Sequence, residues 1–202
     1  MARLGQWAGV AIAALGQWAG VERRYLGQWA GLSTAIEWLV AAQSAASDVD
    51  VGSWNGYTSV QVIGSAEISN TGKQFFRVSI SAASGASFTF ANMYVEHQGA
   101  GDAYDFAASP TQVTFDGGSA GATVGAGTTK VSDLIEFTID SGKALVVAFY
   151  CGSVKDDMAC RNVEANWSSY WKLGSDAITV DKTGYTGSAR DADGILLVES
   201  GE

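Results

Sequence analysis

From about Asp48 onward, apolar and polar residues alternate in short runs separated by glycine-rich turns such as NTGK and DSGK. A period of two is typical of β-strands buried on one face, and Gly, Asn and Asp favour tight turns. The expected strands are QVIGSAEI, QFFRVSISA, SFTFANMYVEH, TQVTF, DLIEFTID, ALVVAFYC, AITV and ILLVES, at residues 61–68, 74–82, 87–97, 111–115, 133–140, 144–151, 177–180 and 195–200. Many short strands of this kind predict a mostly β fold, an antiparallel β-sandwich of jelly-roll type. Residues 144–150 are apolar on both faces and should form a central strand.

The pattern before Asp48 is different. The hexapeptide LGQWAG occurs three times within residues 4–31, and each copy starts eleven residues after the last. Eleven residues make three turns of α-helix with a drift of about 20°, so the copies would return to one face. The large side chains of that face are Leu4, Trp7, Leu15, Trp18, Leu26 and Trp29. The helical pattern continues to about residue 47, with Ile36, Leu39 and Val40 on one face.

The sequence therefore divides into an N-terminal helical segment, residues 1–47, and a β-sandwich domain, residues 48–202. Each glycine inside a helix costs about 1 kcal/mol relative to alanine, so a helix with six of them requires partners. Either sister chains bury the tryptophan stripe, or each LGQWAG copy docks in a pocket of a symmetric partner. Both alternatives make the N-terminal segment an assembly element.

A membrane span over residues 4–21 is a further possibility, because this stretch is uncharged and contains a GxxxG spacing. Two features argue against it. Gln6 and Gln17 lie inside the stretch, and the third LGQWAG copy lies beyond the charged residues 22–24. We therefore do not expect a membrane or export role.

Charge and cysteine content narrow the function further. The chain has 202 residues and a net charge of −9. Residues 1–47 have a balance of +1, so the remainder, with nine basic and nineteen acidic side chains, carries −10. Such an acidic body repels phosphate backbones, which excludes nucleic acid as a favoured partner. Cys151 and Cys160 could bridge two strands, but we favour two thiols; neither a disulfide scaffold nor a zinc motif is present.

The sequence contains no motif typical of a catalytic site. His97 is the single histidine, at the end of an expected strand, and no nucleophile motif such as GxSxG or HExxH accompanies it. We therefore expect no enzymatic activity and no cofactor. Loop aspartates are weak calcium candidates, because carboxylates are suitable hard ligands, but solvated turn residues explain them better. These candidates are Asp102, Asp105, Asp191 and Asp193.

The strongest binding signal is NWSSYWK, at residues 166–172, where Trp167, Tyr170 and Trp171 occur within five residues. Exposed aromatic rings flanked by polar residues can stack on sugar rings and leave hydrogen-bonding groups at the rim. These three residues are therefore candidates for a glycan or partner surface. Packing in the core of the sandwich or at a subunit interface is the alternative explanation.

Several phrases carry a resemblance over about residues 60–200. They are NMYVEHQGAGDAYDF, TQVTFDGGSAGATVGAGTTKVSDLIEFTIDSGKALVVAFY, YWKLGSDAITVDKTGY and ILLVES, of which GDAYDF and KALVVAFY are the most specific. Together they resemble a β-rich module of phage-derived proteins, particularly those of alphaproteobacterial phages. The resemblance implies a virion surface protein such as a spike, fibre or decoration protein. It supplies no catalytic residues and does not extend to the LGQWAG repeats.

We therefore expect a non-enzymatic phage virion structural protein, located at the virion surface, with its N-terminus as the anchor and its β-sandwich displayed outward. Its expected partners are sister chains, most simply in a trimer, other virion proteins and a cell-surface glycan. The main alternative is a secreted or surface-anchored carbohydrate-binding module or adhesin. An esterase or glycosidase with an unrecognised site is the other alternative.

Overall fold

The computed structural model describes residues 35–44, 54–152, 158–161 and 164–202 of the chain. Regular structure in these ranges is β-strand, apart from one short 3-10 turn, η3 (Ser65–Glu67). The strands of the described ranges are β1 (Trp38–Gln43), β2 (Tyr57–Ile63), β3 (Phe75–Ser81), β4 (Phe88–Phe90), β5 (Asn92–His97), β6 (Thr111–Val113), β7 (Ala122–Val124), β8 (Thr129–Val131), β9 (Ile135–Glu136), β10 (Leu145–Tyr150), β11 (Cys160–Arg161), β12 (Trp167–Leu173), β13 (Thr186–Gly187), β14 (Ala192–Asp193) and β15 (Ile195–Gly201).

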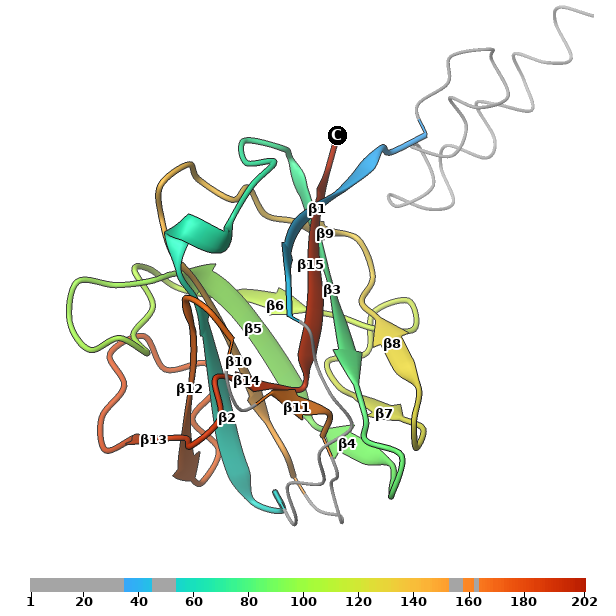
Figure 1. Cartoon of the computed structure of the whole chain (residues 1–202), viewed down its shortest axis with the longest axis vertical. Helices are drawn as coiled ribbons and strands as arrows, with labels where there is room; N and C mark the ends of the chain where they lie inside the picture. The colour runs from blue at the N-terminus through green and yellow to red at the C-terminus, as the bar shows by residue number, and fades with distance from the viewer. Residues whose placement is uncertain (1–34, 45–53, 153–157, 162–163) are drawn as a thin grey trace, which may run out of the picture. The chain divides into compact units, whose positions relative to one another are not determined.

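Two antiparallel sheets pack face to face, as Figure 1 shows. The five-stranded sheet has the order β1-β15-β3-β8, and β9 also pairs with β3. The six-stranded sheet has the order β13-β12-β2-β10-β5-β6. Two small two-stranded sheets, β11-β14 and β4-β7, complete the described strands. The predicted mostly β, sandwich-like fold is therefore confirmed. The prediction of β10 as a central strand is also correct, because β10 lies between β2 and β5 and its residues 145–149 are fully buried.

A hydrophobic core fills the space between the two sheets. Its largest fully buried side chains are phenylalanines, several of which meet edge to face, for example Phe90 and Phe115 with ring centroids 5.0 Å apart. Phe149 of β10 contacts Phe88 in the same way, at 5.7 Å. Edge-to-face pairs of this kind add about 0.5–1.5 kcal/mol each to the gain from buried area. The core therefore holds the six-stranded sheet firmly against the rest of the described unit.

The helical prediction is wrong where the structure describes it, at residues 35–44. Residues 38–43 form strand β1, which pairs with β15 through a bulge between Val40 and Ala42. On the other edge of β1, the Ser69 amide donates to the carbonyl of Ala41 at 2.8 Å. The short apolar run WLVAAQ fits a helix and a strand equally well, so its partner strand decides. The other residues of the predicted helix, 1–34 and 45–47, lie outside the described residues.

The β-rich unit consequently begins earlier than the sequence indicated. The chain divides into two compact units, Met1–Glu37 and Trp38–Glu202, and β1 belongs to the second. Two further expectations fail within that unit. Residues 177–180 form a turn instead of a strand, and the unpredicted strand β12 occupies residues 167–173. The expected run 61–68 covers only the end of β2 and then the 3-10 turn η3, whereas the remaining expected runs each contain a strand.

The pairing of β1 with β15 gives a direct test of this boundary. A fragment of residues 35–202 should unfold cooperatively, whereas a fragment of residues 48–202 lacks β1 and leaves the β15 edge unpaired. Each lost strand hydrogen bond contributes about 1 kcal/mol net, so the shorter fragment should be less stable by at least about 2 kcal/mol. Urea unfolding followed by circular dichroism measures both values. Equal stability of the two fragments would contradict the assignment of β1 to the sandwich.

Candidate binding surface

Strand β12 sends the three predicted aromatic residues to opposite faces of the six-stranded sheet. Trp167 points to the core and is only 4% exposed. Trp171 also faces the core, where its ring meets Tyr57 edge to face at 5.6 Å. Tyr170 points to the outer face, because side chains alternate along a strand. The predicted surface of three neighbouring rings therefore does not form, and Tyr170 alone reaches the outer face.

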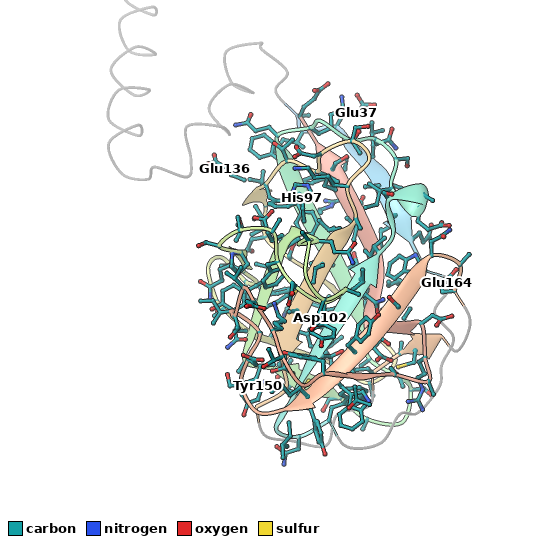
Figure 2. All side chains as sticks on the ribbon, turned by 90° about the vertical axis from the view of Figure 1, so that its left-hand side faces the viewer. Glu37, His97, Asp102, Glu136, Tyr150 and Glu164 are labelled. Carbon is teal, nitrogen blue, oxygen red and sulfur yellow. The ribbon has the colours of Figure 1, made fainter. Side chains whose placement is uncertain are left out.

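The outer face of this sheet carries a second hydrophobic cluster. The residues Tyr170, Val60, Ala148 and Tyr94 lie side by side on β12, β2, β10 and β5 and form one row across the sheet. The buried members of the cluster are Val60, Val62, Phe106, Val146, Ala148 and Ala177. The half-buried tyrosines packed against it are Tyr94, Tyr104, Tyr150, Tyr170 and Tyr185. Figure 2 looks towards this side of the unit, with Asp102 near the middle and Tyr150 near the lower end.

The ring of Tyr104 contacts those of Tyr170 and Tyr185, and we call these three residues the outer tyrosine cluster. The ring centroids of Tyr104 and Tyr185 are 4.9 Å apart with tilted planes, and Tyr104 meets Tyr170 edge to face at 5.1 Å. The hydroxyl of Tyr104 donates to the exposed carboxylate of Asp102 at 2.9 Å. This hydrogen bond raises the pKa of Tyr104 above its ordinary value. The Lys172 ammonium lies 5.6 Å from the Tyr185 ring centroid.

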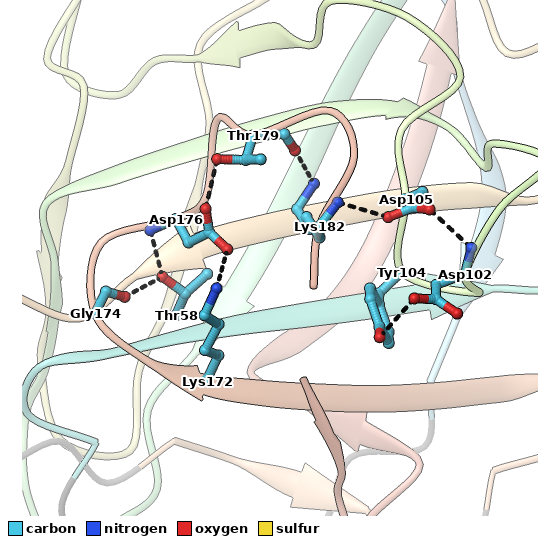
Figure 3. Close-up of polar contacts among 9 residues, drawn as sticks. All are labelled: Thr58, Asp102, Tyr104, Asp105, Lys172, Gly174, Asp176, Thr179 and Lys182. Carbon is cyan, nitrogen blue, oxygen red and sulfur yellow. Dashed lines mark hydrogen bonds and ion pairs between the residues drawn. The ribbon is translucent and has the colours of Figure 1, made fainter. Parts of the chain in front are cut away.

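Two loops, residues 98–110 and 174–185, cover the outer face and are bonded to each other. The Phe106 amide donates to the carbonyl of Val180 at 3.0 Å. The Lys182 amide donates to one carboxylate oxygen of Asp105 at 2.7 Å, and the Asp102 amide donates to the other at 2.7 Å (Figure 3). Asp105 is buried, so its carboxylate ties the two loops together where water does not compete.

Lys182 is a fully buried lysine beneath these loops. Its ammonium lies 3.3 Å from the centroid of the Phe106 ring and donates to the carbonyl of Thr179. Burial lowers the pKa of Lys182 to about 8, although the nearby carboxylates of Asp176 and Asp105 act in the opposite direction. A group so enclosed is placed to hold the loops in position, not to meet a ligand.

Asp176 fixes the second loop to strands β2 and β12. Its amide donates to the hydroxyl of Thr58 at 3.0 Å, and its carboxylate accepts a hydrogen bond from the Lys172 ammonium at 3.1 Å (Figure 3). Burial acts to raise the pKa of Asp176, but hydrogen bonds from Thr179 and Lys172 outweigh it, so the pKa is lowered. Asp176 is thus a charged carboxylate that positions Lys172 beside the outer tyrosine cluster.

His97 ends strand β5, as the sequence predicted, and both of its ring nitrogens have partners. Nδ1 lies 3.1 Å from a carboxylate oxygen of Glu96, and Nε2 accepts the amide of Asp140 at 2.9 Å. Because Nε2 accepts, Nδ1 is the ring nitrogen that bears the hydrogen and donates a hydrogen bond to the Glu96 carboxylate. The ring also packs against Phe137 with centroids 5.2 Å apart. These contacts indicate that His97 anchors the loop that precedes β10.

The four aspartates considered as calcium ligands separate into two places. Asp102 and Asp105 belong to the loops described above. Asp191 accepts the amide of Glu164 at 2.9 Å, and the buried Asp193 accepts the thiol of Cys160 at 3.1 Å. Burial raises the pKa of Asp193. Across the described ranges, no group of three or more His, Cys, Asp or Glu side chains is placed to hold a metal ion.

Both cysteines are buried thiols, as the sequence analysis favoured. Burial raises the pKa of the Cys160 thiol, which keeps it protonated at neutral pH.

The predicted assembly residues Leu4, Trp7, Leu15, Trp18, Leu26 and Trp29 lie outside the described residues. Residues 4–21, the stretch considered as a membrane span, also lie outside the described residues. In the described part of the chain, no helix has the length and apolarity needed to cross a membrane.

No protein-family model matches the chain, and no curated protein matches it in sequence.

The residues that complete the surface are Tyr104, Tyr185, Lys172 and Asp176, which the sequence analysis did not select. One signal was available. Alternation along NWSSYWKL places Tyr170 and Lys172 on one face and the two tryptophans on the other. Their meeting with Tyr104 and Tyr185 depends on the two loops, whose course no local pattern indicates.

The buried ammonium of Lys182 gives a prediction for the pH dependence of stability. Its pKa is about 8 in the folded chain and 10.5 when unperturbed. Between these values the unfolded chain binds more protons, so the free energy of unfolding gains a contribution that rises with pH. Relative to a Lys182→Met variant, the native chain should gain roughly 1–2 kcal/mol from pH 8 to pH 10. Urea unfolding at several pH values measures the difference.

Lys143, an exposed lysine paired with Asp140 at 2.8 Å, provides the matched control. The pairing raises the pKa of Lys143, so the native chain should show no such gain between pH 8 and pH 10 relative to a Lys143→Met variant, which keeps Lys182. Groups such as Cys160 and Tyr185, whose pKa values burial raises, titrate in every variant and cancel in the comparison. A pH-independent difference for Lys182→Met would contradict the buried position of the ammonium.

Proposed function

We propose that the chain is a non-enzymatic virion surface protein of a phage or phage-derived element: a spike, fibre or decoration protein. Its N-terminal LGQWAG segment anchors or oligomerises it, and its β-sandwich faces outward. Within this proposal the sandwich is of jelly-roll type, which the pairing of the first described strand, β1, with the last, β15, supports. The resemblance of residues 60–200 to phage modules supports the same assignment.

One arrangement carries the proposal. The chain enters the β-rich unit at β1, which belongs to the five-stranded sheet, whereas the outer tyrosine cluster lies on the outer face of the six-stranded sheet. The point of attachment and the aromatic surface thus belong to different layers of the sandwich. This separation suits a protein that is fixed at one side and meets its surroundings with the other.

The LGQWAG segment is the proposed assembly element. Trp7, Trp18 and Trp29 recur every eleven residues, and the segment has a charge balance of +1 while the remainder carries −10. A trimer is the favoured state, because three chains could bury their tryptophan stripes against one another. Docking of the repeats on another virion protein is the alternative mode of assembly.

The second candidate function is that of a secreted or surface-anchored carbohydrate-binding module or adhesin. The outer tyrosine cluster favours it, because half-buried aromatic rings beside exposed carboxylates suit sugar recognition. The two candidates differ in where the protein is found. A surface module fractionates with the envelope or the culture medium, whereas a virion protein sediments with particles.

Location provides the direct test. Particles purified by density gradient from an induced culture of the source strain should contain the chain in a fixed ratio to the main capsid protein, as measured by quantitative mass spectrometry. A chain that remains with the cell envelope or the medium, while capsid protein sediments without it, would contradict the virion assignment and favour the surface module.

Oligomerisation is tested with the full chain. We expect a native mass of about three times the 21.0 kDa chain mass in light scattering. Replacement of Trp7, Trp18 and Trp29 by alanine should reduce it to the mass of one chain, with circular dichroism of the sandwich unchanged. The matched control replaces Leu173, Ile178 and Val180, which are exposed apolar residues of the sandwich, by serine. An unchanged oligomer in the tryptophan variant would exclude self-association through the repeats.

A further inference from the structure

We infer that the outer tyrosine cluster, together with Asp102 and Lys172, is a binding site for a neutral polysaccharide. This inference goes beyond the virion assignment and specifies the ligand class of the surface that favours the second candidate function. It concerns what the outer face recognises wherever the chain resides. It rests on the three rings of Tyr104, Tyr170 and Tyr185, on the polar groups beside them and on the charge of their surroundings.

The rings are held in place before any ligand arrives. Tyr170 stands on the central part of β12, in one row with the buried Val60 and Ala148. Tyr104 and Tyr185 belong to the two covering loops, which are tied together by the Lys182 amide donating to the Asp105 carboxylate at 2.7 Å and by the Phe106 amide donating to the Val180 carbonyl at 3.0 Å. Because the rings are already ordered, binding would cost little conformational entropy, which favours the weak contacts that sugars make.

The polar groups beside the rings match the hydroxyls of a sugar. Asp102 is exposed, and one of its carboxylate oxygens accepts a hydrogen bond from the Tyr104 hydroxyl. A carboxylate has further acceptor sites. The Lys172 ammonium uses one of its donors on Asp176 and has three in all. Aromatic faces that contact the C–H side of a sugar, with an acceptor and a donor at their rim, form a suitable site for a pyranose ring.

Local charge selects a neutral ligand. Asp102, which accepts the Tyr104 hydroxyl, and Asp181 of the covering loop are exposed, and the chain carries a net charge of −9, so an acidic polysaccharide would be repelled. A cationic ligand is also disfavoured. Tyrosine rings attract cations, but the chain's own Lys172 ammonium already lies 5.6 Å from the Tyr185 ring centroid.

The position of the cluster on a sheet face favours a polymer over a single sugar. The rings of Tyr104, Tyr170 and Tyr185 are connected through contacts of about 5 Å, and the covering loop adds the exposed Ile178, which follows Ala177 of the same hydrophobic cluster. Several sugar residues of one chain could therefore contact it together. Each site would bind weakly, and several copies on one particle or oligomer would strengthen attachment through avidity.

The test uses the full chain and native gels that contain soluble polysaccharides. The neutral probes are a β-glucan, a galactomannan and dextran, and the acidic probes are alginate and hyaluronate. At least one neutral polymer should retard the native chain, and the acidic polymers should not. For that polymer, Tyr170→Ala and Tyr185→Ala should each weaken binding at least about tenfold, as expected for loss of a stacking contact of more than about 1.4 kcal/mol.

Tyr94→Ala is the matched control. Tyr94 is a half-buried tyrosine on the same outer face and in the same row as Tyr170, but three strand spacings, about 14 Å, away from it. Its replacement should change binding less than twofold. Tyr170→Phe keeps the ring and should keep most of the affinity, which separates stacking from a general loss of fold. Thermal unfolding of every variant verifies that the sandwich is intact.

Three outcomes would overturn the inference. The first is that no neutral polymer retards the native chain. The second is retardation by acidic polymers only, which would contradict the argument from charge. The third is an equal loss of binding in folded Tyr94→Ala and Tyr170→Ala variants, which would show that the cluster is not the site. None of these outcomes depends on whether the chain is found on particles, so this inference and the proposed function can fail separately.

Discussion

The apolar side chains on the outer face of strand β2 are buried, and this burial requires the two loops that cover the six-stranded sheet. β2 lies between β12 and β10, and its outward side chains, Val60 and Val62, are as apolar as many core residues. A sheet that is apolar on both faces needs cover on both. The five-stranded sheet covers the inner face, and residues 98–110 and 174–185 cover the outer face. The outer tyrosine cluster forms where these loops meet β12.

The buried charged groups of Lys182 and Asp105 are better explained by their role in fixing the course of the loops than by a contribution to the free energy of unfolding. Taking the Lys182 ammonium and the Asp105 carboxylate out of water is costly, and well-packed apolar residues often serve stability as well or better. Each of these groups instead makes hydrogen bonds to the loop backbone: the Lys182 ammonium donates to the carbonyl of Thr179, and the Asp105 carboxylate accepts the amides of Lys182 and Asp102. Such bonds fix the course of two irregular segments, and a recognition surface built on loops requires that precision.

The sequence predicted those parts of the fold that local patterns determine. The alternation and the fully apolar run at residues 144–150 identified the sandwich and its central strand, and His97 was placed at a strand end. The prediction failed where a distant partner decides. Residues 38–43 fit a helix until β15 pairs with them, and residues 177–180 look like a strand but cross the outer face without a strand partner. The tyrosine cluster is also non-local, because it joins residues 104, 170 and 185 through loop packing.

The edges of the described sheets offer little surface for strand pairing between copies of the chain. An unprotected edge strand can pair with another chain. Among the described strands, β13 has two residues and the β6 and β8 edges have three each. The longer edge strand, β1, is occupied, since the carbonyls of Val40 and Ala41 accept hydrogen bonds from Asn70 and Ser69. The sandwich thus offers little edge for pairing with copies of itself. The proposed association through the LGQWAG segment requires no strand pairing at these edges.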